Sequence, residues 1–571
     1  METTRHDVVI LGGGLAGLTL ALQLKRRRPE TDILVIESRA GAAPDAAFKV
    51  GESTVEISAH YFADVVGLRD HLENDQLHKF GLRFYLTVGD NSDVTRRVEF
   101  APTLKPPADT FQIDRGRFEN EIRRRAEAAG VEVLDGASVS DVDLGDELHT
   151  VHAQRGSETL TATGRWVVDA SGRASLLKRK LGLAKESGHH INASWIRLDG
   201  GLDHEKWGAD NEAWMSRMPE SGLRMYSTTH LMGRGYWVWM IPLVSGPISI
   251  GICADPRVHP YEQINTRDAF IEWLLEHEHQ LGAEIDGRRD QIVDFLRVED
   301  FSYNCKRMLS PERWALTGEA AAFADPLYSP GSDFISYANT WIDDVIVRDL
   351  SGEPWDEVED RLELYNFIYS RMFTGQIGAY RNMYPMFGSS QAMLAKLAFN
   401  AFTFFSLFGL AFTQDRLTDL DFVAFVSDIF EVAGPLMGQM EDLFRRWAEL
   451  DDRELEQGAL LINEWPVHRE RNLDLVREWS DEGLRERFTD NLRLMQAMAI
   501  LMWYRATRVL PDGPPVDEDT PVNPAAVSLT LSRWEKDGLV GHGGMTVREA
   551  GELIPEIERV WLDEATAPIG T

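Results

Sequence analysis

Hydrophobic and polar positions follow two different patterns along the chain, and the change falls at about residue 340. Before that point, short apolar runs such as residues 7–11 and 33–36 predict strands that alternate with helices. After it, apolar residues at helical spacing predict helices that are rich in Trp, Phe and Met. The pattern therefore predicts an α/β unit followed by a helical region.

The most apolar segment of the helical region, residues 397–412, is short for a membrane span, which needs roughly 20 residues. We expect a buried helix, with a helix at a membrane surface or against a lipophilic substrate as the alternative. The phenylalanines Phe402, Phe404, Phe405 and Phe408 are either plain core or part of a large apolar pocket.

Apolar and polar residues alternate strictly between residues 79 and 88, which predicts a half-buried strand. The apolar members are Phe80, Leu82, Phe84, Leu86 and Val88. Lys79 falls near the start of this strand on its polar face, where a lysine is most often a charge that discourages strand pairing.

A glycine turn joins the first predicted strand, residues 7–11, to a helix. Gly12 permits the tight turn, Gly14 lets a pyrophosphate approach the backbone, and Gly17 lets the helix pack closely on the strand. The N-terminus of the helix offers unpaired N–H groups to phosphates. Glu37 ends the next predicted strand, where a carboxylate accepts hydrogen bonds from ribose hydroxyls. This order of elements predicts a dinucleotide-binding fold.

Three later segments add to this picture. Residues 166–172 (WVVDASG) predict a buried strand that returns to the first sheet and ends beside the cofactor. Residues 314–331 (WALTGEAAAFADPLYSPG) predict a strand, a turn and the start of a helix. The stretch 193–255 is rich in predicted strands and contains WVWMIP, whose two tryptophans lie on one face of a strand.

Composition narrows the classes of function. The chain has 571 residues, 43% of them hydrophobic, which allows a large folded core, and a formal net charge of −33, which disfavours nucleic acid as a partner. Cys253 and Cys305 support no disulfide framework, and the histidines at 189–190 and 277–279 lack further metal ligands at informative spacing. We expect a cytoplasmic protein with no transmembrane span, no secretory signal and no metal.

The glycine turn at residues 12–17, VVDASGR near residue 170 and TGEAAAFADP near residue 318 together resemble the FAD-dependent monooxygenase superfamily with the glutathione-reductase-like FAD fold. Within that superfamily the chain is similar to the flavin-dependent halogenases of the tryptophan-halogenase-like group. Lys79 in a KxxxxF context, WVWMIP and DPLYSPG carry this narrower resemblance, which covers about the first 340 residues. DPLYSPG follows the DPLxSxG spacing of halogenases, where related hydroxylases read PxxGxG.

The resemblance implies a set of site residues. FAD is expected to contact Gly12, Gly14, Leu15, Ala16, Gly17, Glu37, Ser38, Arg117, Asp169, Ala170, Gly172, Gly318, Glu319, Asp325, Gly331 and Ser332. The halide is expected at Ser329, Gly331 and Ser332, the substrate at Trp237, Trp239 and Tyr328, and catalysis at Lys79 and Ser329.

The resemblance also implies a reaction. FADH2 from a separate NAD(P)H-dependent flavin reductase reacts with oxygen to give a C4a-hydroperoxide, which converts chloride or bromide to hypohalous acid. Lys79 then either hydrogen-bonds this oxidant or becomes a haloamine, and an electron-rich aromatic carbon attacks the halogen. A partly desolvated lysine has a lowered pKa and nucleophilic character, which suits this role. The chain carries no second nucleotide motif, in agreement with reduction by another protein.

Three positions depart from the family pattern. Tyr328 stands where tryptophan halogenases have a glutamate, which favours a phenol, a pyrrole or a carrier-tethered aryl group over free tryptophan. Pro330 removes a backbone N–H from the expected halide turn, and Glu319 replaces an aspartate. Two alternatives stay open: a related flavoenzyme that hydroxylates, epoxidises or desaturates without halide, and a flavin-binding pseudoenzyme that serves as an assembly partner.

We therefore expect an α/β, glutathione-reductase-like FAD-binding fold interleaved with a substrate-side β-sheet, followed by a helical C-terminal region. The expected FAD-binding parts are residues 1–60, 100–190 and 300–345, and the expected sheet parts are residues 61–99 and 191–299. Residues 346–510 are expected to form a helical cap over the substrate, and residues 511–571 a linker with a helical tail. The sequence does not predict the oligomeric state.

Overall fold

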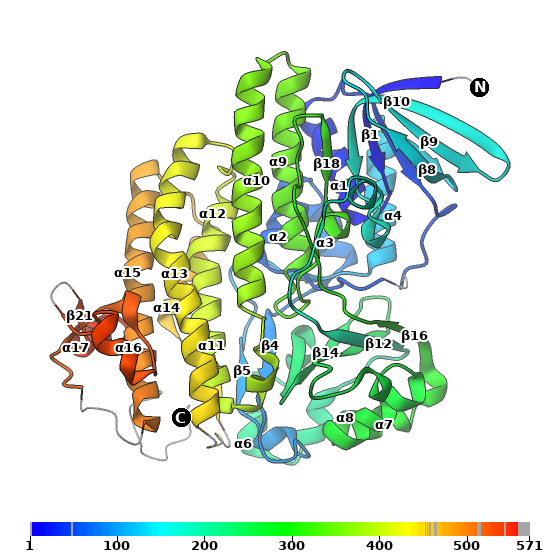
Figure 1. Ribbon diagram of the computed structural model, residues 1–571. Helices are drawn as coiled ribbons and strands as arrows, with labels where there is room; N and C mark the ends of the chain where they lie inside the picture. Colours follow the sequence, from blue (N-terminus) through cyan, green and yellow to red (C-terminus); the bar gives the residue numbers. More distant parts are fainter. Residues whose placement is uncertain are drawn as a thin grey trace.

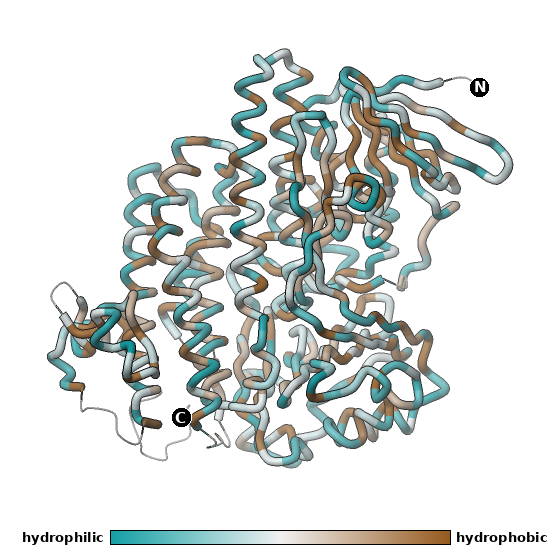
Figure 2. Tube along the Cα trace, viewed as in Figure 1, coloured by the Kyte–Doolittle hydropathy of each residue, from teal (hydrophilic) through white to brown (hydrophobic). Residues whose placement is uncertain are grey.

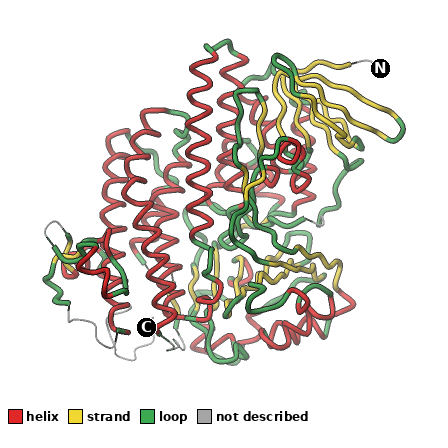
Figure 3. The backbone as a smooth tube through the Cα atoms, in the orientation of Figure 1, coloured by secondary structure: helices red, strands yellow, loops and turns green. Residues whose placement is uncertain are grey.

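The computed structural model describes residues 3–557 except 47–48, 452, 454, 456–457, 462–464, 511–515 and 542–543. Two β-sheets lie on one side of the molecule, one above the other in Figure 1, and long helices stand side by side on the other. Figure 3 shows the same division, with most of the strands on one side and the short pair of β20 (Pro521–Val522) and β21 (Met545–Thr546) beyond the long helices. The change of hydrophobic pattern near residue 340 thus corresponds to a change of architecture.

The upper sheet in Figure 1 is built around buried parallel strands. Its strands are β7 (Glu132–Asp135), β2 (Ile33–Glu37), β1 (Thr3–Leu11), β10 (Glu158–Asp169), β9 (His149–Arg155) and β8 (Ser138–Asp143) in spatial order, with β18 (Trp314–Leu316) beside the end of β10. β1, β2, β10 and β18 run parallel, so their carboxyl ends meet at one edge. The brown strands of this sheet in Figure 2 are its buried apolar runs.

The lower sheet is mostly antiparallel and has eight strands among the described residues. They are, in spatial order, β16 (Ile292–Val298), β12 (Asn192–Leu198), β15 (Ile248–Ala254), β14 (Tyr236–Pro242), β13 (Thr228–Gly233), β4 (Leu82–Tyr85), β5 (Glu99–Ala101) and β19 (Ala459–Leu461). β19 comes from the helical region and pairs in parallel with β5, so the two halves of the chain share this sheet.

Smaller elements complete the α/β half. The short strand pairs are β3 (Leu77–His78) with β6 (Phe111–Gln112), and β11 (Ala184–Lys185) with β17 (Asn304–Cys305). The helices are α1 (Leu15–Arg27), α2 (Glu56–His60), α3 (Arg69–Asp75), α4 (Arg115–Ala128), α5 (Leu176–Lys180), α6 (Glu212–Met215), α7 (Arg267–His277) and α8 (His279–Asp286). Cys253 and Cys305 are free and buried.

The strand predicted for residues 79–88 is much shorter in the structure, because regular pairing is confined to β4. Gly81 has a φ of +64°, which interrupts the extended backbone before β4 begins. Lys79 therefore precedes the strand, its amide donates to the carbonyl oxygen of Thr110, and its side chain is fully buried. The prediction that Lys79 lies on the polar face of a strand was wrong.

The helical half begins at α9 (Gly331–Leu350), which still packs on α1. It continues through α10 (Trp355–Gly378), α11 (Ser390–Thr403), α12 (Leu410–Thr413), α13 (Leu420–Leu450), α14 (Pro466–Asp474) and α15 (Asp481–Ala506). The last described elements are β20 (Pro521–Val522), α16 (Leu531–Lys536), β21 (Met545–Thr546) and α17 (Val547–Leu553), which packs on α15. The predicted linker and tail fall partly on residues 511–515, 542–543 and 558–571, outside the described residues.

The apolar segment around residues 397–412 lies in one continuous helical stretch, Ser390–Thr413, and a π-helical turn at Phe404–Gly409 separates α11 from α12. Within the described residues this stretch is the one long and apolar enough to cross a membrane. Its most apolar window is 72% buried inside the protein, as the sequence predicted for a core helix.

Candidate active site

The glycine turn between β1 and α1 forms a tight junction at the carboxyl edge of the upper sheet. Gly12 has a φ of +116°, and a Cβ at this position would lie 2.4 Å from the carbonyl oxygen of Ala170. A Cβ at Gly17 would lie 2.1 Å from the carbonyl oxygen of Gly12, so α1 packs directly on the turn. Only glycine fits at these two positions.

The N-terminus of α1 is suited to an anion. No side chain caps it and its first turn carries no acidic residue, so the amides of Leu15 and Ala16 face outward with the positive end of the helix dipole. A Cβ at Gly14 would have only the ammonium of Lys49 within reach, at 3.5 Å, so this part of the turn is open and lies beside a cation. The residues present therefore fit the pyrophosphate of FAD.

Glu37 and Asp169 take different positions around this cradle. Glu37 ends β2 and accepts a hydrogen bond from the Gly13 amide at 2.8 Å, with Ser38 exposed beside it. Asp169 is fully buried at the end of β10, and its carboxylate accepts hydrogen bonds from the amides of Ser171 and Leu177 at 3.0 and 2.8 Å. Its side chain thus stabilises the turn that follows β10.

The third motif abuts the first. Gly318 follows β18 with a φ of +60°, and a Cβ there would lie 3.0 Å from the Cβ of Ala16 at the start of α1. The backbone carbonyl of the next residue, Glu319, accepts a hydrogen bond from the Tyr303 hydroxyl at 2.9 Å. Gly172 also has a positive φ, +61°, with open space around it. The three predicted cofactor motifs therefore meet at one edge of the sheet.

The contact of Arg117 with the cofactor stays a prediction. It lies in the first turn of α4 with its guanidinium 3.5 Å from the carboxylate of Asp45, and about a third of its side chain is exposed. The cation that stands beside Gly14 is Lys49, which pairs with the buried Glu119 at 2.8 Å.

Asp325 opens the DPLYSPG segment and is buried in a hydrogen-bond network of its own. His189 Nε2 and the Tyr384 hydroxyl each lie 2.7 Å from Asp325 Oδ2. Trp237 Nε1 in turn donates to the Tyr384 hydroxyl at 2.9 Å. This network connects β14 to the DPLYSPG turn, so Asp325 and Trp237 hold the turn in place.

The turn itself is strained. Tyr328 and Ser329 are consecutive residues with φ values of +71° and +59°, a left-handed conformation that costs a residue other than glycine roughly 1 kcal/mol or more. Pro330 then caps α9 without a side-chain hydrogen bond, and Gly331 and Ser332 form the first turn of the helix. A halide at Ser329, Gly331 and Ser332 stays a prediction.

Lys79 lies at the centre of a chain of polar contacts that reaches this turn. Its ammonium donates to the Ser53 hydroxyl at 2.8 Å and to the carbonyl oxygen of Thr54 at 2.5 Å. The Ser53 hydroxyl oxygen in turn lies 3.1 Å from that of Ser329. Burial lowers the pKa of Lys79 to about 7. The two residues predicted to be catalytic, Lys79 and Ser329, are therefore linked through Ser53.

Two buried carboxyl groups accompany Lys79, and the sequence did not point to either. Burial raises the pKa of Asp333, in the first turn of α9, to about 8. Burial likewise raises the pKa of Glu56, at the start of α2, whose carboxylate accepts a hydrogen bond from the Asn472 amide at 3.0 Å. Both carboxyl groups interact electrostatically with the Lys79 ammonium, and we call Glu56, Lys79 and Asp333 the Lys79 cluster.

The Lys79 cluster faces a cavity of about 930 Å³ between the lower sheet and the helical half, a volume in the range of small-molecule sites. Tyr328 lines this cavity as predicted, together with Leu82, Phe84 and Phe100 of the lower sheet. Trp237 and Trp239 do not line it, because they pack within the sheet, and Trp239 Nε1 donates to the Ser249 hydroxyl at 3.2 Å.

The helical wall of the cavity is mostly apolar and has features that keep it open. Phe404, Phe405 and Phe408 of the π-helical turn line it, whereas Phe402 does not. Four helical glycines also line it, and a Cβ added at any of them would meet nothing within 4 Å: Gly375, Gly378, Gly434 and Gly438. Glycine inside a helix costs roughly 1 kcal/mol relative to alanine. The open space is thus maintained at some expense in helix stability.

His189 and His190 each lie beside a single acidic side chain. No group of three or more His, Cys, Asp or Glu side chains that could hold a metal ion is found among the described residues. His189 hydrogen-bonds the Asp325 carboxylate, and His190 lies 3.1 Å from Asp300 at the surface. These histidines serve in local pairs.

Known proteins resemble the chain in sequence. A family described as FAD binding domain matches residues 5–246. A flavin-dependent halogenase of Dictyostelium discoideum is 28% identical over 435 residues, which cover 70% of this chain and 70% of that protein. A chlorinase of Pseudomonas fluorescens, named for pyrrole-2-carbonyl groups on a peptidyl-carrier protein, is 25% identical over 58% of this chain and 73% of its own length.

Solved structures resemble the chain in fold. Halogenase PltM in complex with phloroglucinol and FAD has a TM-score of 0.59 at 15% identity, with 89% of this chain and 97% of that chain covered. The flavin-dependent brominase Bmp2 has a TM-score of 0.53 at 22% identity, with 67% and 89% covered. These likenesses confirm the predicted α/β FAD-binding fold with a helical C-terminal region.

Proposed function

We propose that this chain, which is an FAD-dependent oxidoreductase of the flavin-dependent halogenase family, installs chlorine or bromine on a phenolic ring at Lys79. The observation that carries the proposal is a buried lysine of lowered pKa that lines a large cavity and is linked through Ser53 to Ser329. Perturbed ionisable groups in a cavity are characteristic of active sites.

FAD is the proposed cofactor, and its reduced form is the proposed source of the halide oxidant. Gly12, Gly14, the N-terminus of α1 and Lys49 would hold the pyrophosphate, because they form an open cradle beside a cation. Reduced FAD, when bound, supplies the electrons with which dioxygen converts halide to hypohalous acid. We propose that a separate NAD(P)H-dependent flavin reductase provides FADH2, since the sequence contains one dinucleotide motif.

Lys79 acts on the hypohalous acid as a hydrogen-bond donor. Its ammonium donates to the oxygen of the acid, and the aromatic carbon attacks the halogen, so that the O–halogen bond breaks and the C–halogen bond forms. The departing hydroxide takes a proton from the Lys79 ammonium and leaves as water, and the proton that the ring then loses restores the ammonium. The Ser53 hydroxyl and the Thr54 carbonyl oxygen fix the ammonium in place during this step.

Glu56 and Asp333 are the candidate acceptors of the proton that the halogenated ring loses. The attacked ring must lose one proton to recover its aromaticity, and an ionised carboxylate within the cavity can accept it. Burial raises the pKa of both carboxyl groups, that of Asp333 to about 8, so a carboxylate of either residue holds the proton that it accepts.

Among the substrates that the sequence left open, we propose a phenol. The ring must carry an electron-donating group, and the hydroxyl of a phenol is one. Curated relatives include a carrier-protein chlorinase and a tetracycline 7-halogenase, so tethered pyrroles and free aromatic compounds both occur as substrates among relatives. The phenol is our proposal for this chain.

The test supplies the purified protein with FADH2, oxygen, and bromide or chloride, and follows a simple phenol by mass spectrometry. Wild type should yield halogenated phenol, and Lys79→Met should lose it while still consuming FADH2. Lys178→Met is the matched control, because Lys178 is also buried with a pKa lowered to about 8 but does not line the cavity. Wild type that oxidises FADH2 without forming halogenated product under either halide would contradict the proposal.

A halide-independent oxygenase remains the second candidate, and Pro330 is the observation that favours it. Pro330 precedes the first turn of α9 and removes one donor from the expected halide turn. The same reaction without halide distinguishes the two functions, because an oxygenase would produce hydroxylated phenol in a chloride- and bromide-free buffer.

A further inference from the structure

A second pair of buried charges lies in the helical wall of the cavity, away from the catalytic machinery. Lys396 of α11 donates to the carboxylate of Glu441 of α13, and Lys396 is fully buried. Glu441 lines the cavity and is 9% exposed. A buried ion pair rarely adds stability over apolar residues of similar size. Stability therefore does not explain this pair, and we consider a role in binding.

Two more polar groups belong to the same place. Asn400, one helical turn after Lys396, lines the cavity and lies near the Glu441 carboxylate. The Tyr328 hydroxyl is shielded from solvent and forms no hydrogen bond of good geometry among the described residues, although Asn400 and Glu441 are its polar neighbours. Glu441, Asn400 and Tyr328 thus form a polar patch in an otherwise apolar wall, which we call the Glu441 patch.

Tyr328 connects the Glu441 patch to the reacting end of the cavity. Its backbone precedes Ser329, which reaches Lys79 through Ser53. Its ring packs edge-on against Phe84 with 6.0 Å between centroids, and its hydroxyl lies toward Asn400 and Glu441. Tyr328 therefore bridges the two polar ends of the cavity, and one elongated molecule that lies along its ring can contact both.

The cavity as a whole is elongated along α13. The cavity-lining residues of α13 run from Val423 to Arg445, about 33 Å at 1.5 Å per residue. Gly434 and Gly438 of the same helix leave open space in front of Glu441. A single small phenol would fill only part of this length, which favours a longer molecule.

We propose that the Glu441 patch is a substrate-anchoring site that accepts a hydrogen bond from the far end of an elongated, uncharged diphenol whose near ring is halogenated at Lys79. The Glu441 carboxylate accepts from the distal hydroxyl, and Lys396 orients that carboxylate by donating to it. A positively charged distal group is disfavoured, since Lys396 already neutralises Glu441. This inference rests on the proposed function for the identity of the reacting end, but the patch can be tested without catalysis.

The test compares two probes of the same skeleton, 4,4′-methylenediphenol and 4-benzylphenol, which differ only in the distal hydroxyl. Their dissociation constants are measured by titration calorimetry with the full chain, in the absence of reductant and halide. We expect wild type to bind the diphenol about tenfold more tightly, the effect of one hydrogen bond to a charged acceptor. Because no turnover is needed, a failure of halogenation leaves this result interpretable.

Lys396→Met/Glu441→Leu removes the pair without leaving an unpaired charge. We expect the tenfold preference to vanish while the affinity for 4-benzylphenol is retained. Arg446→Met/Glu449→Leu is the matched control, because it removes an exposed ion pair of the same helix and should keep the preference. Asn400→Leu leaves Lys396 and Glu441 in place and should reduce the preference, which keeps the inference testable if the double variant folds poorly. Equal affinity of wild type for the two probes, or a preference that survives in the double variant and in Asn400→Leu, would overturn the inference.

Discussion

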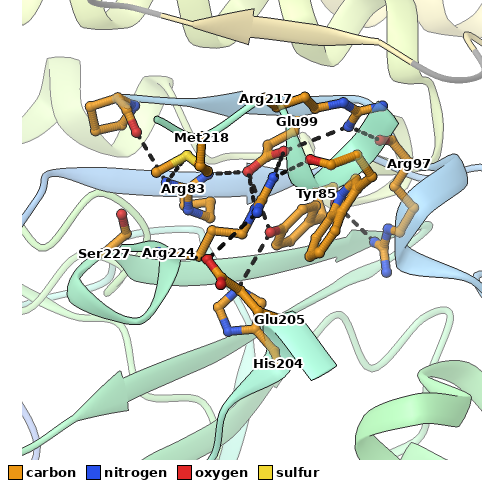
Figure 4. A network of polar contacts seen from close by, with 12 residues as sticks. Arg83, Tyr85, Arg97, Glu99, His204, Glu205, Arg217, Met218, Arg224 and Ser227 are labelled. Carbon is orange, nitrogen blue, oxygen red and sulfur yellow. Dashed lines mark hydrogen bonds and ion pairs between the residues drawn. The ribbon is translucent and has the colours of Figure 1, made fainter. Parts of the chain in front are cut away.

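Two groups of charged side chains are buried on opposite faces of the lower sheet, and they differ in how well their charges are paired. The first, which we call the Glu99 network, consists of Glu99, Arg83, Arg217 and Arg224 (Figure 4). The second is the Lys79 cluster, whose lysine stands four residues before Arg83 in the sequence. Leu82 and Phe84 of β4 line the cavity and Arg83 does not, so Arg83 points to the other face.

Pairing decides what burial does to each group. Burial by itself would raise the pKa of Glu99, but Arg83 and Arg224 outweigh it and lower that pKa to about 2. In the Lys79 cluster burial prevails, with the pKa of Lys79 lowered to about 7 and that of Asp333 raised to about 8. A charge with several partners is fixed and structural, whereas one with few partners stays close to neutrality and can exchange protons.

The largest expected effect is on the rate of halogenation and concerns the Lys79 cluster. Lys79→Met should lower the rate of halogenation about 10³-fold, because the donor to the oxidant is lost. Its melting temperature should not fall, since the substitution removes a buried, poorly paired ammonium. Turnover with a phenol and thermal denaturation measure both. A variant that halogenates at the wild-type rate would remove Lys79 from the mechanism.

The next effect is on stability and belongs to the Glu99 network. Glu99→Gln should lower the free energy of unfolding at pH 7 by about 3 kcal/mol, because three arginines lose their buried counterion. The folded pKa of Glu99 lies below its ordinary value of 4.5, so its contribution is present above pH 4.5 and is lost as pH falls toward 2. Urea unfolding at several pH values should show the difference from wild type narrowing in that range.

A third prediction concerns the pH dependence of halogenation. If Lys79 acts as an ammonium donor, kcat/KM should fall about tenfold for each pH unit above its pKa of about 7. A haloamine route needs the neutral amine and would give the opposite slope. The profile should be recorded with chloride and with bromide, because the two hypohalous acids ionise at different pH. If the alkaline limb of the kcat/KM profile falls at the same pH with both halides, it reports the ionisation of a group on the enzyme and not that of the hypohalous acid.

The smallest effect lies within the Lys79 cluster. Asp333 favours the charged form of Lys79, so Asp333→Asn should lower the pKa of the lysine and move the alkaline limb to lower pH by less than about one unit. Thr340→Val, at a half-buried position of the same helix outside the cavity lining, is the control, because the Thr340 hydroxyl donates to the Ser336 carbonyl oxygen. An unchanged limb in Asp333→Asn would show that the two groups do not share their protons.

The features that could be predicted from the sequence are those that depend on consecutive residues. The glycine turn at Gly12 to Gly17 depends on local backbone geometry, which glycine alone permits, so its fold and position could be predicted. The order of the motifs likewise predicted the FAD-binding fold. The departure at Tyr328 was also visible, because it interrupts a recognisable pattern.

The partners of Lys79 could not be predicted, because they come from distant parts of the chain. Glu56 and Asp333 are 23 and 254 residues away from Lys79 in the sequence, and an isolated carboxylate carries no pattern of its own. The same applies to Lys396 and Glu441, which lie on different helices. Trp237 misled because a tryptophan pattern shows which face of a strand it occupies but not whether a cavity lies there.

The pairing of β19 with β5 affects how the protein folds while the ribosome synthesises it. The strand that completes the lower sheet beside β5 is residues 459–461, some 358 residues after the end of its partner at Ala101. At about 5–20 residues per second, synthesis of that interval takes roughly 20–70 s. Throughout this time β5 is an unpaired edge, open to contact with other chains. The nascent α/β half therefore passes through an extended period in which it needs protection.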